Sequence, residues 1–138
     1  MRTIRFRGYS EDLKTFVHGF YHEIDTDGIG YSYIFDNGKT TYVRADSVGQ
    51  FTGLHDKNGK EIYTGDILQL KKLDGSVLLY KIFSVKGGFA FNTHQDDFHK
   101  LPIKIYFYES TSDMQNSGFI STLEIIGNIY ENPELLTD

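Results

Sequence analysis

Two dipeptides, Asn37-Gly38 and Asp74-Gly75, constrain the fold of this chain more than any other feature of its sequence. Asn, Asp and Gly tolerate the positive φ angles that a two-residue type I′ turn requires, and each pair lies between segments rich in β-branched and aromatic residues. The strands that these turns predict cover residues 29–36, 39–44, 66–73 and 76–85. Two such hairpins commit much of the chain to antiparallel sheet.

Further strands are predicted where apolar and polar residues alternate, at residues 3–9, 89–92, 103–109 and 119–130. We expect the last of these strands to bend at Gly127. In residues 29–36, Tyr31, Tyr33 and Phe35 share one face of the predicted strand.

Three segments are less regular. Residues 14–24 fit either a helical stripe or a strand, and we expect a strand because of Gly19 and the β-branched and aromatic content. Residues 45–59 are expected to form a long irregular connection. "ENPELL" (131–136) predicts a short helix, with Asn132 as its cap and Pro133 in the first turn.

The stretch "DKNGKEIYTGDILQL" (56–70) predicts how the chain enters its second half. Asp56, Asn58 and Gly59 make a turn, and Thr64-Gly65-Asp66 makes a second turn before a buried strand. We expect the glycine to bend the backbone and the aspartate to anchor the bend. This order of turn, short strand, turn and long strand is typical of a small SH3-like barrel.

These patterns predict a mainly β protein, with a β-rich α+β fold as the alternative. Its 11 Phe and 10 Tyr residues indicate an aromatic core. The expected organisation is an N-terminal β-rich subdomain over residues 1–52, followed by an SH3-like barrel with a short C-terminal helix over residues 53–138.

Two stretches have some likeness to calcium loops. An EF-hand loop needs oxygen ligands at positions 1, 3 and 5, Gly at position 6 and an acid at position 12. With Gly59 at position 6, Leu54 and Gly65 occupy the first and last positions, and neither side chain can ligate. The loop at residues 23–34 fails at Ile34, so we interpret it as a solvated turn.

Two histidine motifs have residue types that occur in enzyme and metal sites. His18 and His22 have the i, i+4 spacing of helical zinc ligands, but Glu23 follows the second histidine instead of the first. "HQDDFH", from His94 to His99, could ligate a metal or share a proton, but a solvated loop explains it more simply. We therefore expect no catalytic, metal or cofactor-binding residues, and no enzyme activity.

The amino-acid composition argues against several other classes of function. The chain has no Cys, which removes disulfides, thiol catalysis and thiolate metal sites and fits a cytoplasmic setting. No secretory signal or membrane-spanning apolar run is visible. The formal net charge of −5 disfavours broad binding of nucleic acid. The aromatic and basic residues of "IRFRGY" and "LYKIF" could bind single strands, although aromatics pointing inward and cations outward explain both segments more simply.

Three segments together resemble the YopX family of small phage and prophage proteins: "IRFRGY" near the start, "QFTGLHDKNGKEIYTGDIL" in the centre and "IIGNIYENPELL" near the end. Gly8-Tyr9 replaces the family's usual Ala-Trp pair, Thr64 stands where an acid is common, and His55 stands where Lys is common. The resemblance implies an SH3-like barrel, an additional N-terminal portion and self-association. It implies no activity, because the family has no established biochemical function.

We therefore expect an uncharacterised phage or prophage accessory protein in the bacterial cytoplasm. It is expected to be a non-catalytic binding or self-assembling module that forms a homo-oligomer or binds an unknown protein partner. A nucleic-acid-binding accessory factor is the alternative.

Overall fold

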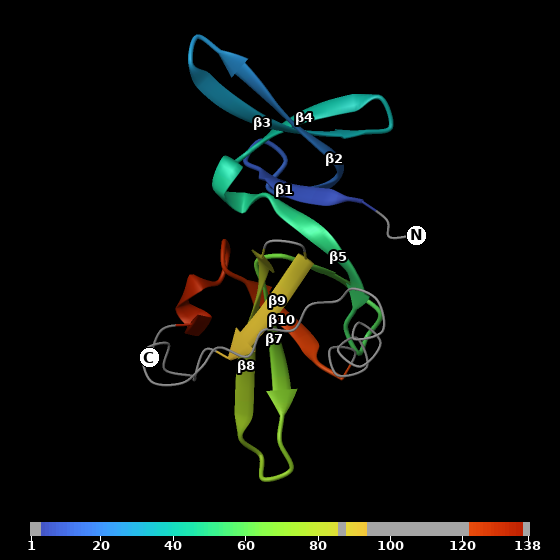
Figure 1. Ribbon diagram of the computed structural model, residues 1–138, viewed down its shortest axis with the longest axis vertical. Coiled ribbons are helices and arrows are strands. Elements are labelled where there is room, and N and C mark those ends of the chain that lie inside the picture. The colour runs from blue at the N-terminus through green and yellow to red at the C-terminus, as the bar shows by residue number, and fades with distance from the viewer. Residues whose placement is uncertain (1–3, 86–87, 94–121, 137–138) are drawn as a thin grey trace. The chain divides into compact units, whose positions relative to one another are not determined.

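The computed structural model describes residues 4–85, 88–93 and 122–136 (Figure 1). The chain is mainly β, as predicted, and divides into two compact units, residues 1–53 and 54–138. Its strands are β1 (Phe6–Ser10), β2 (Thr15–Thr26), β3 (Ile29–Asp36), β4 (Lys39–Val43), β5 (Gly49–His55), β6 (Glu61–Tyr63), β7 (Asp66–Lys71), β8 (Val77–Val85), β9 (Gly88–Thr93) and β10 (Glu124–Asn128).

In the first unit, the antiparallel strands lie in the order β4-β3-β2-β1-β5. The type I′ turn predicted at Asn37-Gly38 is confirmed, because these residues have φ angles of 51° and 79° between the paired residues Asp36 and Lys39. A second turn of this kind, at Asp27-Gly28, joins β2 to β3. The segment 23–34, which has some likeness to a calcium-binding loop, is therefore a β-hairpin with its turn at Asp27-Gly28.

The ambiguous segment 14–24 is a strand, as expected. Up to Gly19, β2 pairs with β1, and from Phe20 onwards it pairs with β3. One long strand thus serves two hairpins.

The sheet of the first unit curls until its first and fourth strands meet at one end. The Arg44 N–H donates to the Tyr9 carbonyl oxygen at 2.9 Å, just beyond the end of β4. The Val43 side chain lies so close to Gly8 that a Cβ atom at position 8 would be 2.6 Å from the nearest Val43 methyl carbon. Ile34, Val43 and Phe51 are buried in this unit.

The prediction of an irregular connection over residues 45–59 is wrong. It contains a 3-10 helix, η1 (Ala45–Ser47), and the strand β5, which pairs with β1 through Gly49 and Gln50. Phe51 and Thr52 in β5 are buried. The glycines at 49 and 53 hide this strand from a propensity argument, because glycine is disfavoured in strand interiors.

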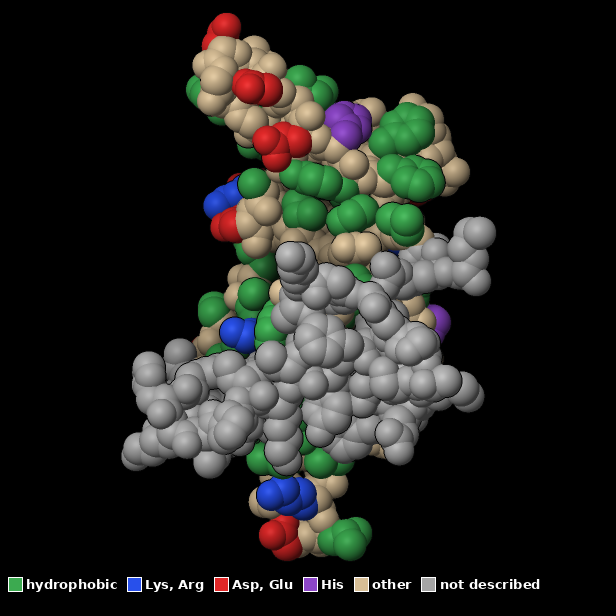
Figure 2. Space-filling view, in the orientation of Figure 1, with side chains coloured by type: hydrophobic (Ala, Val, Ile, Leu, Met, Phe, Trp, Pro, Cys, Tyr) green, Lys and Arg blue, Asp and Glu red, His purple; other side chains and the backbone are tan. Residues whose placement is uncertain are grey.

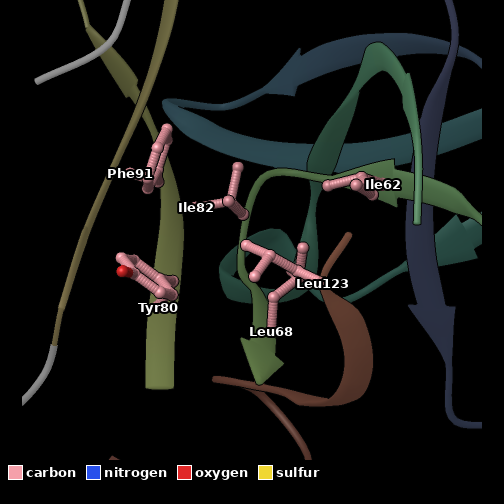
Figure 3. Packing of buried hydrophobic residues seen from close by; sticks show 6 residues of the cluster. All are labelled: Ile62, Leu68, Tyr80, Ile82, Phe91 and Leu123. Carbon is pink, nitrogen blue, oxygen red and sulfur yellow. The ribbon is translucent and has the colours of Figure 1, made fainter. Parts of the chain in front are cut away.

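The second unit contains the antiparallel sheet β10-β7-β8-β9. Apolar side chains from several strands converge on one core, in which the Tyr80 and Phe91 rings pack edge to face at 5.3 Å (Figure 3). The buried members of this core are Ile62, Leu68, Tyr80, Ile82, Phe91 and Leu123. The expected bend of the last strand is confirmed, since its register with β7 shifts between Ile125 and Gly127.

The SH3-like barrel is not confirmed, because the described strands form no closed barrel. The strand predicted at residues 103–109 lies outside the described residues. The short C-terminal helix is a 3-10 helix, η2 (Pro133–Leu136). At its start, the Asn132 carbonyl oxygen accepts the Leu135 N–H at 3.1 Å, and Oδ1 of Asn132 accepts the Asn128 N–H at 3.2 Å.

The second predicted hairpin is present, but its turn differs from the prediction. Lys72 N–H donates to the Ser76 carbonyl oxygen, and Gly75 N–H donates to the Lys72 carbonyl oxygen, so three residues form the loop. Gly75 has a φ of 90°, whereas Asp74 is not among the residues with positive φ. Asp74 Oδ1 instead accepts both the N–H and the hydroxyl of Ser76, at 2.9 and 2.6 Å.

Candidate interaction surface

Asp56 in the central motif connects two distant parts of the second unit. Its side chain is only 4% exposed. Oδ1 accepts the N–H groups of Asn58 and Lys60, each at 2.9 Å, and Oδ2 accepts the N–H of Ile125 in β10 at 3.0 Å. One carboxylate therefore closes its own turn and fixes a strand 69 residues away in sequence.

The pKa of Asp56 reflects this environment. Burial raises the pKa, but the three backbone N–H donors and the charge of Lys60 outweigh burial and bring the pKa below the ordinary value of 3.8. The carboxylate is thus held in its charged form as a structural acceptor. A general acid would need the opposite shift.

Gly65 and Asp66 form the predicted bend before β7. Gly65 has a φ of 94°, and Oδ2 of the buried Asp66 accepts the Tyr63 N–H at 2.8 Å. The Gly65 N–H donates to the Ile82 carbonyl oxygen, and the Gly65 carbonyl oxygen accepts the Ile129 N–H, both at 2.8 Å. The prediction that aspartate anchors a glycine bend is confirmed.

The C-terminal motif is held together in the same way. Asn128 is buried, and its Oδ1 accepts the N–H groups of Tyr130 at 3.0 Å and Glu131 at 2.8 Å. Gly127 has no Cβ, which leaves room for the Asn132 side chain, whose Oδ1 would lie 2.6 Å from a Cβ at that position. The polar residues of both motifs therefore satisfy backbone groups inside the fold.

His18 and His22 do not have the helical geometry of zinc ligands, because both residues lie on the strand β2. Four residues along a strand span about 13 Å, too far for two side chains to share an ion in the helical manner. Within the described residues, no three His, Cys, Asp or Glu side chains come together in a way that could hold a metal. The segment from His94 to His99 lies outside the described residues.

An exposed sheet face in the first unit is the feature that sequence reasoning identified only in part. Cross-strand pairs place aromatic residues opposite one another: Phe20 faces Phe35 across β2 and β3, and Tyr33 faces Tyr42 across β3 and β4. We call this surface the aromatic face, and its residues are Phe20, His22, Ile24, Ile29, Tyr31, Tyr33, Phe35 and Tyr42. Hydrophobic side chains gather on this unit in the space-filling view (Figure 2).

Four rings of the aromatic face form a continuous contact series. His22 stacks on Tyr33 at 5.7 Å between ring centroids, and Tyr42 lies 5.7 Å from Tyr33 and 6.1 Å from Tyr31. Such cross-strand ring pairs stabilise the sheet and fix the rings in place. The surface is therefore preorganised for contact.

The aromatic face is nevertheless open to solvent. Phe20 is 65% exposed and Tyr42 is 50% exposed, whereas Ser32 and Ile34 on the opposite side of β3 are buried. None of the eight residues is Lys, Arg, Asp or Glu. Arg44, which follows β4, forms ion pairs with Glu11 at 2.5 Å and with Asp46 at 3.6 Å.

In the described part of the chain, no helix is long and apolar enough to cross a membrane.

No curated protein matches the chain. A family model described as "YopX protein" matches residues 5–137. The structure is similar to a crystal structure of protein EF1440 from Enterococcus faecalis, with a TM-score of 0.50 and 23% sequence identity over 99% of this chain and 100% of that one. At this identity the likeness concerns the fold alone.

Proposed function

The chain belongs to the YopX family, and from that premise we propose that it is a non-catalytic module that self-associates through its aromatic face. The observation that carries the proposal is the exposure of aromatic rings on the adjoining strands β2, β3 and β4, in a set of residues that contains no Lys, Arg, Asp or Glu. We further propose that it is an accessory protein of a phage or prophage that works in the bacterial cytoplasm.

The size of the aromatic face supports a binding role. At about 200 Å² for a whole aromatic side chain, the exposed fractions of Phe20 (65%), Phe35 (40%) and Tyr42 (50%) leave roughly 300 Å² uncovered. Ile24 and Ile29 are also about half exposed and extend this area. The largest apolar patch of a typical monomer is about 300–600 Å² and is often functional.

The lack of charge favours a second copy of the chain as the partner. In a two-fold interface the same patch meets itself, so any charged residue near the axis comes close to its own symmetry mate. The aromatic face avoids this repulsion, because none of its residues is Lys, Arg, Asp or Glu. Because the patch is smaller than the roughly 800 Å² per partner of a standard interface, we expect association in the micromolar range.

The alternative, a single-stranded nucleic acid, has less support. Stacked bases suit exposed rings, but nucleic-acid grooves also provide cations for the backbone phosphates. The aromatic face has no Lys or Arg. Arg7 on β1 pairs with His18 and so lies beside the aromatic face, where its guanidinium carbon packs 4.6 Å from the centre of the Phe16 ring.

Sedimentation of the full chain over a range of concentrations tests the proposal. Phe20→Glu should shift the protein towards monomer by at least about tenfold in dissociation constant, because the new charge meets its own mate. Leu73→Glu is the matched control, since Leu73 is a fully exposed apolar residue of the β7–β8 loop and lies outside the aromatic face. It should leave association unchanged.

The proposal is overturned if the wild-type chain stays monomeric at about 1 mM, or if Leu73→Glu weakens association as much as Phe20→Glu does. A salt-sensitive complex with a single-stranded oligonucleotide, lost in Phe20→Glu but not in Leu73→Glu, would replace self-association with the nucleic-acid alternative.

A further inference from the structure

The curled sheet of the first unit encloses a cavity on the side opposite to the aromatic face. β1 and β4 meet at one end, where Val43 contacts Gly8 and the Arg44 N–H bonds to Tyr9. A cavity of about 300 Å³ is lined by residues of β2, β3 and β4, by Arg5 just before β1 and by Leu13 in the turn between β1 and β2. The mouth of a partly closed sheet is a common place for small-molecule sites.

The floor of this cavity is apolar and its rim is polar. Leu13 is 49% exposed and lines the cavity together with the partly exposed Val17, so a ligand would rest on aliphatic carbon. Arg5 and Lys39 contribute positive charges to the lining. His18 is a further nitrogen donor, and Asp36, the cross-strand partner of Lys39, is the one carboxylate among the lining residues.

The charges of the lining residues identify the chemical class of ligand. Two permanent cations and one carboxylate give the cavity a positive balance, although the whole chain has a formal net charge of −5. Arginine offers a planar fork of donors that fits carboxylate and phosphate groups, and a lysine near it adds a point charge. A volume of about 300 Å³ is at the lower limit for small-molecule sites.

We propose that this cavity binds a small organic anion, in which a phosphate or carboxylate group contacts Arg5 and Lys39 and a compact apolar body rests on Leu13 and Val17. This inference is independent of self-association, because Ile34, which also lines the cavity, lies on the opposite side of β3 from Tyr33 and Phe35.

Calorimetric titration of the full chain tests the proposal with four probes that separate its parts. Phenyl phosphate and benzoate carry an anion on an apolar ring, inorganic phosphate carries the anion alone, and benzyl alcohol carries the ring alone. We expect phenyl phosphate or benzoate to bind with a dissociation constant of about 1 mM or tighter. Inorganic phosphate and benzyl alcohol should each bind at least about tenfold more weakly, because each lacks one of the two contacts.

Lys39→Gln should weaken binding of the preferred probe by about tenfold, since one charge-assisted contact is lost. Lys39→Arg should restore most of the affinity. Lys71→Gln, which removes a lysine of the second unit at the end of β7, should have no effect. Lys39 is exposed and follows the turn, so its variants are expected to fold even if Arg5→Gln does not.

A preference between phenyl phosphate and benzoate identifies the anionic group. The proposal is overturned if none of the four probes binds below about 10 mM, if benzyl alcohol binds as tightly as the anions, or if Lys71→Gln weakens binding as much as Lys39→Gln.

Discussion

Replacement of Asp56 by Asn should destabilise the protein far more than a change of one oxygen to nitrogen suggests. The Asn side chain keeps one acceptor for the N–H groups of Asn58 and Lys60, which both bond to Oδ1. Its NH₂ group then replaces Oδ2, which accepts the Ile125 N–H at 3.0 Å, so two donors face each other next to β10.

The expected loss follows from the burial of this site. A hydrogen bond to a charged group contributes about 1.5–3 kcal/mol, and an unpaired buried donor costs a similar amount. Since Asp56 is 4% exposed, water cannot easily replace the lost oxygen. We expect Asp56→Asn to lower the free energy of unfolding by about 2–3 kcal/mol.

Urea unfolding followed by circular dichroism measures this loss, because the chain has no Trp to serve as a fluorescent probe. Asp74→Asn is the matched control: Asp74 also accepts an N–H two residues on, but in an exposed loop, and its replacement should leave the free energy of unfolding almost unchanged. A loss below about 0.5 kcal/mol for Asp56→Asn, or equal losses for both variants, would refute this reasoning.

Three further predictions use the same unfolding assay. Because the folded state lowers the pKa of Asp56 below 3.8, its stabilisation should be present above that pH and fade as the pH falls further, so wild type and Asp56→Asn should converge in acid. Gly8→Ala should cost about 1–3 kcal/mol, because the new methyl group collides with Val43, and Val43→Ala should restore part of this loss; no loss from Gly8→Ala contradicts the close approach. Gly65→Ala should cost about 1–2 kcal/mol from its φ of 94°, and wild-type stability in that variant would show that the bend is not strained.

The turns show how far sequence could predict the fold. Asn37-Gly38 specifies its turn, because both residues accept positive φ and nothing nearby competes. At Asp74-Gly75 the position of the hairpin was correct but the turn type was not. The hydroxyl and N–H of Ser76 both bond to the Asp74 carboxylate, and Leu73 joins the loop. A dipeptide pattern does not include this side-chain competition.

The aromatic face could be predicted only in part. Alternation correctly placed Tyr31, Tyr33 and Phe35 on one side of a strand, but a period of two does not say which side is buried. Here the buried side has the smaller residue Ser32 beside Ile34, because the sheet curls so tightly that Val43 touches Gly8. The curvature of the folded sheet determines which side of β3 is buried, and no local sequence pattern encodes that curvature.

The link from Asp56 to Ile125 also bears on how the chain folds during its synthesis. Every strand partner of β1 to β4 lies before residue 53, so the first unit can assemble as soon as that part leaves the ribosome. The second unit has to wait, because β7 pairs with β10 and the Asp56 carboxylate requires a backbone donor near the end of the chain. While residues 72–123 are still being translated, the edge of β7 that pairs with β10 is open, and that interval is when the nascent protein is most exposed to mispairing or to a chaperone.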